Sequence, residues 1–160
     1  MHLVSRMALI ALVIGASTAV VGTGRLTWSL VVSGTLLWSV VPLLQLLSGV
    51  LLIRRADRQA LDGYFSTHRS WSMWLLAGAA AVLVLPDPGG ALMFLAATAV
   101  VPIILTARAL AAFCRDSLGL SRASARRRVG LHQVVTYAVV LAYADFAVAL
   151  MPRILALVGK

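Results

Sequence analysis

Five apolar stretches alternate with shorter polar connections along the 160-residue chain. The apolar stretches cover 7–24, 27–53, 71–85, 91–112 and 131–158. All but 71–85 have at least 18 residues, about the length that a helix needs to cross a hydrocarbon core of roughly 30 Å. Apolar and polar residues do not alternate within them, as the strands of a membrane β-barrel would require. The pattern therefore predicts one all-α integral membrane domain over 1–160, a five-helix transmembrane bundle.

The connections hold most of the charged residues. We expect loops over 54–70 and 113–130, and a tight turn at 86–90, where the sequence PDPGG joins the third and fourth spans into a hairpin. Within 54–70, the spacing of Asp57, Leu61, Tyr64 and Phe65 predicts a short helix on the membrane surface. Its aromatic side chains are of the types found among lipid headgroups.

The basic residues predict the orientation of the bundle. Eleven of the 14 lie on one side of a five-span arrangement, and only Arg25, Arg153 and Lys160 lie on the other. By the positive-inside rule, the N-terminus is cytoplasmic and the C-terminus external. The marked excess of arginine over lysine, together with abundant alanine, favours a bacterial origin, so we expect a multi-pass protein of the inner membrane.

The N-terminal segment has a second interpretation. It begins with a basic residue, continues as an apolar run, and has small residues at Ser17 and Ala19, spaced as at a signal-peptidase site. Retention as the first span and cleavage as a signal peptide both remain open. The predicted orientation is the same in both cases, because the next span still enters the membrane from outside.

The hydrophobic content and the net charge of the chain indicate which kinds of partner to expect. The chain is 61% hydrophobic and 12% charged, with a formal net charge of +9. Because the arginines fall between apolar segments, they predict contact with anionic lipid headgroups and not with nucleic acid. The arginines expected at this face are Arg54, Arg55, Arg58, Arg69, Arg126, Arg127 and Arg128. The lone Cys114 excludes an internal disulfide, and no metal or cofactor motif occurs, so we predict neither metal nor cofactor.

Four of the spans place polar groups at a similar depth. Counting from the span centres at 1.5 Å per residue, these groups lie about 5 Å outward of the midplane. They are Ser17, Thr18, Ser39, Thr98 and Asp145. Pro42 and Pro102 lie near the middles of two spans and predict kinks close to this layer.

Asp145 is the most unusual member of this layer, since a charge at such depth costs about 2.5–3.5 kcal/mol. We therefore expect it to face protein or a water-filled cavity. One interpretation is a protonated carboxyl hydrogen-bonded to another helix, and the other is an ionisable group lining a cavity. Small residues at four-residue spacing, among them Ala11, Gly15 and Ala19 and also Ala138 and Ala142, predict close helix contacts within the bundle or in an oligomer.

Three functional hypotheses follow. The first is a non-enzymatic accessory, scaffold or complex subunit that packs with a second copy or a membrane protein partner. The second is a small transporter or channel-like subunit that uses Asp145 and the hydroxyl layer. The third is a membrane enzyme acting on lipid-linked phosphate, with His68 and His132 as acid–base groups at the cytoplasmic face. The first is the one we favour, with no catalytic residue assigned.

Overall fold

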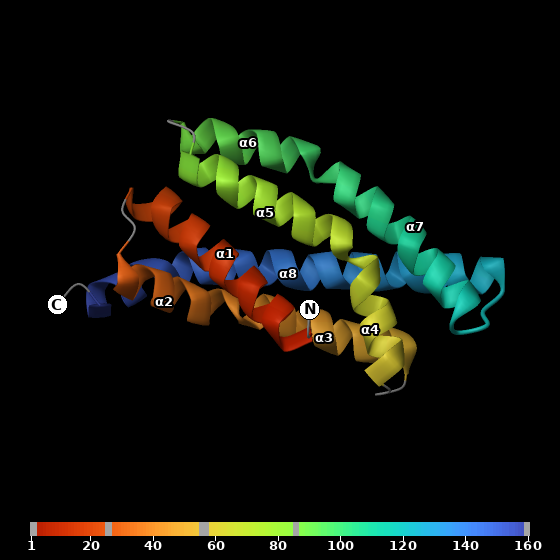
Figure 1. The fold of residues 1–160 in the computed structure, drawn as a ribbon. Coiled ribbons are helices and arrows are strands. Elements are labelled where there is room, and N and C mark those ends of the chain that lie inside the picture. Colours follow the sequence, from red (N-terminus) through yellow and green to blue (C-terminus); the bar gives the residue numbers. More distant parts are fainter. Residues whose placement is uncertain (1–2, 25–26, 55–57, 85–86, 159–160) are drawn as a thin grey trace.

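The computed structural model describes residues 3–24, 27–54, 58–84 and 87–158, and within these ranges every regular element is an α-helix (Figure 1). The helices are α1 (Leu3–Thr23), α2 (Trp28–Trp38), α3 (Val40–Ile53), α4 (Arg58–Thr67), α5 (Arg69–Val84), α6 (Pro88–Thr98), α7 (Val100–Asp116) and α8 (Arg122–Val158). The all-helical prediction is thus confirmed for the described residues. The stretch 113–130, expected as a loop, is mostly helical, because α7 and α8 both extend into it.

Two long apolar segments are broken where the prolines predict kinks. α2 and α3 meet at Ser39, and α6 and α7 meet at Ala99, each three residues before a proline. Pro42 and Pro102 have no N–H to donate, and each ring crowds the carbonyl four residues earlier. The Ala99 N–H consequently bonds the Ala96 carbonyl at 3.3 Å, a tighter turn than in an α-helix. The bend between α6 and α7 is visible in Figure 1.

The helices run back and forth along one axis. Figure 1 shows the start of α2, the start of α6 and the C-terminal end of α8 at one end of the molecule. The ends of α3 and α7 and the start of α8 lie at the other, which we call the arginine-rich end. Among the described residues, three segments are long and apolar enough to cross a membrane, namely Trp28–Ile53, Gly89–Asp116 and Arg122–Leu150, and Met7–Val20 is a shorter apolar helix.

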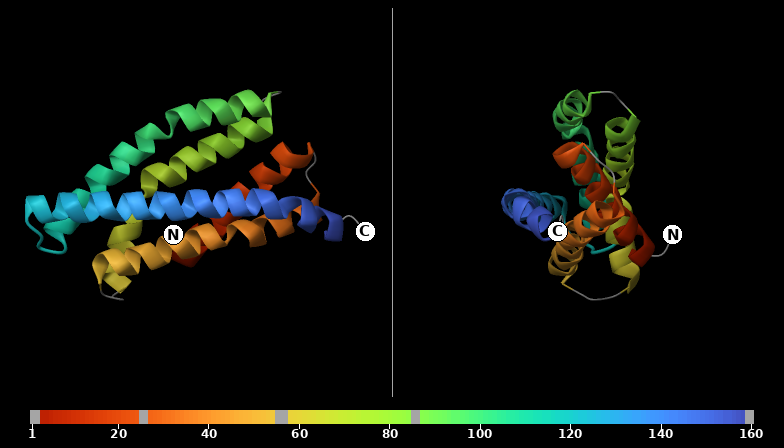
Figure 2. Two further views of the ribbon diagram at one scale, coloured as in Figure 1. Left: turned by 180° about the vertical axis from the view of Figure 1, so that it is seen from behind. Right: turned by 90° about the vertical axis from the view of Figure 1, so that its left-hand side faces the viewer.

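α8 lies at the edge of the bundle. Its 37 residues extend for about 55 Å, well beyond the thickness of a hydrocarbon core. Seen along the bundle, it packs beside α2 and α3 on one side of the molecule (Figure 2, right). Over 18 consecutive residues of its membrane-length segment only 6% are buried within the chain, so most of this part of α8 faces outward.

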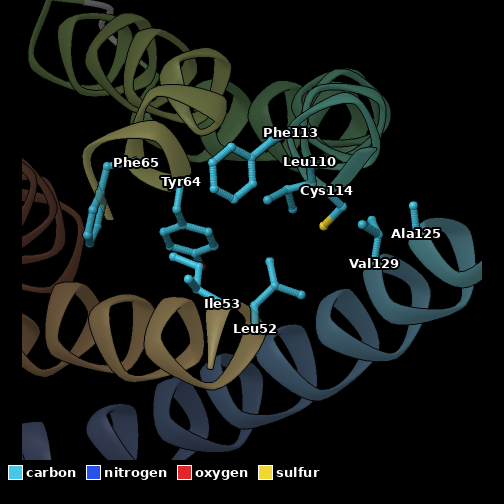
Figure 3. Close-up of a cluster of buried hydrophobic side chains, with 9 residues drawn as sticks. All are labelled: Leu52, Ile53, Tyr64, Phe65, Leu110, Phe113, Cys114, Ala125 and Val129. Atoms are coloured by element: carbon cyan, nitrogen blue, oxygen red, sulfur yellow. The ribbon is translucent and has the colours of Figure 1, made fainter. Parts of the chain in front are cut away.

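The main hydrophobic core lies at the arginine-rich end, where α3, α4, α7 and α8 converge (Figure 3). It consists of Leu52, Ile53, Tyr64, Phe65, Leu110, Phe113, Cys114, Ala125 and Val129. α4 is the short helix that the sequence predicts, but its aromatic residues do not face outward. Tyr64 has no exposed surface and Phe65 has 4%. The Tyr64 ring points into the cluster between α3 and α7, whereas the Phe65 ring lies on the other side of Tyr64, away from Phe113 (Figure 3). Gly49 of α3 leaves the space that the Tyr64 ring occupies.

α1 and α2 approach each other through glycine. A Cβ built on Gly15 would lie 2.4 Å from the Thr35 nitrogen, and one on Gly34 would lie 2.7 Å from the Gly15 carbonyl oxygen. Ala11 and Ala19, one turn on either side of Gly15, are buried against this contact. The first small-residue stripe therefore packs inside the bundle. By contrast, Ala138 and Ala142 of α8 are exposed.

Candidate functional site

Asp145 lies on the outward face of α8. The residues of α8 that turn toward the bundle here include Tyr143, whose hydroxyl donates to the Leu37 carbonyl, and Ala147, which is 1% exposed. Asp145 is two positions from each, which at about 100° per residue places it on the opposite side of the helix. It is exposed, and it forms no hydrogen bond or ion pair with any part of the chain that the structure describes. Its carboxyl group therefore points away from the other helices.

The other residues of the predicted polar layer bond to their own helices. Ser17 donates to the Val13 carbonyl at 2.8 Å, and Thr18 donates to the Ile14 carbonyl at 2.9 Å. Ser39 donates to the Leu36 carbonyl at 2.6 Å. Such bonds satisfy the hydroxyls locally, so these side chains need no polar partner on another helix. Within the described part of the chain, no side-chain contact joins any of them to Asp145.

Thr98 is the one layer residue with a bond between helices. Its hydroxyl donates to the carbonyl of Phe94 or Leu95 and accepts a hydrogen bond from Trp74 Nε1 at 3.1 Å. This bond links α5 to α6, which Figure 1 shows side by side. Trp74 thus ties the hairpin together, a structural role that its position in the sequence did not indicate.

His68 and His132 are brought together by Tyr64. Their ring centroids lie 4.6 Å and 5.7 Å from that of Tyr64, and the Tyr64 hydroxyl is 3.3 Å from His132 Nε2. The same hydroxyl is 3.2 Å from Ser48 Oγ, which donates to the Gln45 carbonyl. One assignment of the protons satisfies all three contacts. His132 Nε2–H donates to the Tyr64 hydroxyl, the Tyr64 hydroxyl donates to Ser48 Oγ, and Ser48 donates to the Gln45 carbonyl. This relay connects α8, α4 and α3 across the core.

Tyr64 stays protonated within the relay. Burial, partly offset by the hydrogen bond with Ser48, raises the pKa of Tyr64 from 10.0 to about 12. Its hydroxyl therefore keeps one proton to donate at every physiological pH. A tyrosine with so high a pKa is a poor general base, so the relay orients side chains more readily than it moves protons.

This pKa shift predicts a loss of stability at high pH. Above pH 10 the unfolded chain loses the Tyr64 proton, whereas the folded chain keeps it until about pH 12. The free energy of unfolding therefore has its full value below pH 10 and decreases by an amount on the order of 2 kcal/mol between pH 10 and 12. We expect the thermal midpoint of the protein in detergent to fall over this range, and to fall less steeply in Tyr64→Phe. Circular dichroism melts at pH 9, 10, 11 and 12 would measure it. Parallel curves for the two proteins would contradict the assignment to Tyr64.

No carboxylate accompanies the two histidines within the described ranges. Asp62 and Asp116 are both exposed, and Asp57 lies outside the described residues. No group of three or more His, Cys, Asp or Glu side chains is placed to hold a metal ion in the part of the chain that the structure describes. Acid–base chemistry on a lipid phosphate would need a carboxylic acid beside the two histidines. The residue that lies between them is a tyrosine.

An inner pocket of about 200 Å³ lies beside this pair, between α1, α3, α5 and α8. Gln45, His68 and His132 line it, together with Gln133 and Thr136. Trp38 Nε1, Gln133 Nε2 and Thr136 Oγ1 are buried around it without a hydrogen-bond partner among the described residues. Gln133 and Thr136 were not among the residues expected from the sequence, although Thr136 follows His132 by four residues and so shares its helix face.

A second, larger opening separates α3 from the first turns of α8. This basic groove has a volume of about 490 Å³. Three of the predicted lipid-contact arginines line it, Arg54, Arg127 and Arg128, and His132 and Thr136 border both openings. Arg58, Arg69 and Arg126 are exposed away from the groove, and Arg55 lies outside the described residues.

Comparisons of the chain with protein-family models, with curated protein sequences and with solved structures find no match.

Proposed function

We propose that this chain is a non-enzymatic subunit or scaffold of a membrane assembly, and that it associates with a second copy of itself through α8. In this proposal it is a multi-pass protein of the bacterial inner membrane with five spans, a cytoplasmic N-terminus and an external C-terminus. The arginine distribution supports the orientation. The alternation of helix ends along the molecule supports an odd number of crossings (Figure 1).

The exposed position of Asp145 carries the proposal. The side chain lies in a membrane-length apolar segment, Arg122–Leu150, and points away from its own bundle. Facing lipid, a charged carboxylate at this depth costs about 2.5–3.5 kcal/mol. A second protein surface with a hydrogen-bond partner removes that cost.

The residues around Asp145 form a stripe that suits helix pairing. Val134, Ala138, Leu141, Asp145 and Val148 are all exposed, and they follow one another at alternating intervals of four and three residues. This is the spacing of the buried seam of a coiled coil. Ala138, one turn from the exposed Ala142, allows close approach of a neighbouring backbone.

A second copy meets these requirements with a single symmetry operation. Two copies with the same orientation are related by a two-fold axis along the membrane normal. Each residue of the interface therefore lies at the same membrane depth as its equivalent in the second copy. Asp145 then lies opposite Asp145 of the second copy, where the two side chains form a hydrogen bond across the interface. A single polar position in an apolar seam also fixes the register of the pair.

Substitutions at Asp145 test this interface. We expect Asp145→Asn to retain self-association, since the amide still hydrogen-bonds, and Asp145→Leu to weaken it about tenfold, because membrane hydrogen bonds are worth about 0.6–2 kcal/mol. Energy transfer between labelled copies in vesicles of increasing lipid-to-protein ratio would measure the association. Ala138→Leu should weaken it too, whereas Val139→Leu, on another face of α8, should not.

Monomeric wild-type protein at every lipid-to-protein ratio would refute self-association. The transport alternative gains no support from Asp145, which lines neither the inner pocket nor the basic groove. The enzymatic alternative gains none from His68 and His132, since no acid lies with them in the described ranges. Self-association is therefore the function that the surroundings of these residues support best.

A further inference from the structure

The basic groove concentrates positive charge, with no counterion among the described residues. Arg54 enters from the end of α3, while Arg127 and Arg128 enter from the first turns of α8. None of the described residues that line the groove is acidic, and no ion pair joins these arginines to any of them. Guanidinium groups bind phosphate through paired, charge-assisted hydrogen bonds, so the groove is complementary to a phosphate.

Arg54 takes a backbone conformation that is costly for its residue type. It ends α3 with φ 58°, and its N–H donates to the Val50 carbonyl at 2.8 Å. Glycine usually occupies this left-handed position at a helix end, because a Cβ is strained there. Glycine would suit the backbone of α3 better, and an arginine there places a guanidinium at the groove instead.

The remaining walls of the groove are apolar. Leu51, Leu131 and Val135 line it and are 67%, 66% and 51% exposed. Inorganic phosphate would leave these side chains uncovered, whereas a molecule with a phosphate head and hydrocarbon chains would cover them. α3 and α8 run side by side here (Figure 2, left).

We propose that the groove between α3 and α8 is a binding site for one anionic phospholipid, with its phosphate held by Arg54, Arg127 and Arg128 and its chains against the leucine and valine side chains. His132 borders the groove, held by its bond with Tyr64. This site differs from general attraction of arginines to an anionic surface, because it is saturable and depends on particular arginines. It is also independent of self-association.

Short-chain lipids added to the protein in non-ionic detergent test the proposal. Dioctanoyl phosphatidylglycerol should raise the thermal midpoint saturably and appear as one bound molecule in native mass spectra. Dioctanoyl phosphatidylcholine should bind more weakly, because none of the described side chains of the groove is acidic and could pair with its choline. Inorganic phosphate should bind weakly. If phosphate binds as well as phosphatidylglycerol, or if the two lipids bind equally, the proposal is overturned.

Three variants distinguish binding at this groove from nonspecific attraction of the lipid to positive charge. Arg127→Gln should weaken binding of phosphatidylglycerol about tenfold. Arg122→Gln removes the same charge from an exposed position of α8 outside the groove, and it should change binding less than twofold. Arg54→Gly should weaken binding about tenfold while the lipid-free protein becomes as stable as wild type or more so. Equal effects of Arg122→Gln and Arg127→Gln, or unchanged binding in Arg54→Gly, would overturn the proposal.

Discussion

Replacing Gly15 by valine should prevent α1 from packing on α2. Even the first carbon of the new side chain would lie 2.4 Å from the Thr35 nitrogen and 2.6 Å from the Gly34 carbonyl carbon. Both are backbone atoms, so no side chain can rotate away to make room. The two helices must separate, which exposes Ala11 and Ala19, and we expect a loss of about 3 kcal/mol or more.

Gly130 provides the matched control for this substitution. It lies within α8, is exposed, and a Cβ there would meet no atom within 4 Å. Gly130→Ala should therefore stabilise the protein by about 0.5–1 kcal/mol, because alanine loses less backbone entropy in a helix. Thermal melts of both variants in one detergent would compare them. If Gly15→Val melted at the wild-type temperature, the close crossing of α1 and α2 would be wrong.

Replacing Tyr64 by alanine should have the second large effect. The ring is fully buried between α3, α4, α7 and α8, and removing it leaves a cavity that these helices cannot fill without moving (Figure 3). Truncations of buried aromatic residues cost about 3–5 kcal/mol. The change also removes the hydroxyl that lies between Ser48 and His132.

Tyr64→Phe separates packing from hydrogen bonding. The phenyl ring fills the same space, so only the hydrogen bonds are lost, and we expect a cost of about 1–2 kcal/mol. The decrease in thermal midpoint should be two to three times larger for Tyr64→Ala than for Tyr64→Phe. Equal decreases would show that the relay, and not the ring, accounts for the stability of this core.

The sequence predicted the helices better than it predicted their faces. Long apolar runs and the positions of Pro42 and Pro102 were sufficient to locate the segments and their breaks, because chain length and the missing proline N–H act locally. Tyr64 and Phe65 were placed among headgroups, whereas they are buried. An aromatic residue at a membrane boundary suits both environments, and only the packing of α7 beside α4 distinguishes them (Figure 3).

The same limit applies to the candidate sites. Depth along a span follows from residue counting, but rotation about the helix axis depends on which neighbours pack against it. Asp145 was assigned to a shared layer by depth, and its outward direction depends on the contacts of Tyr143 and Ala147. The meeting of His68 with His132 depends on α4 turning Tyr64 inward, which no periodicity in either histidine's own segment indicates.

The composition of the core cluster has a consequence for biosynthesis. Leu52 and Ile53 leave the ribosome early, whereas Ala125 and Val129 of the same cluster come from the last third of the chain. The apolar surface of α3 and α4 therefore has no complete covering while the intervening residues are being made. Because α8 closes this core, a chain truncated before Ala125 would leave the cluster without Ala125 and Val129 and Tyr64 without its contact with His132, and such a chain would expose apolar surface that promotes aggregation.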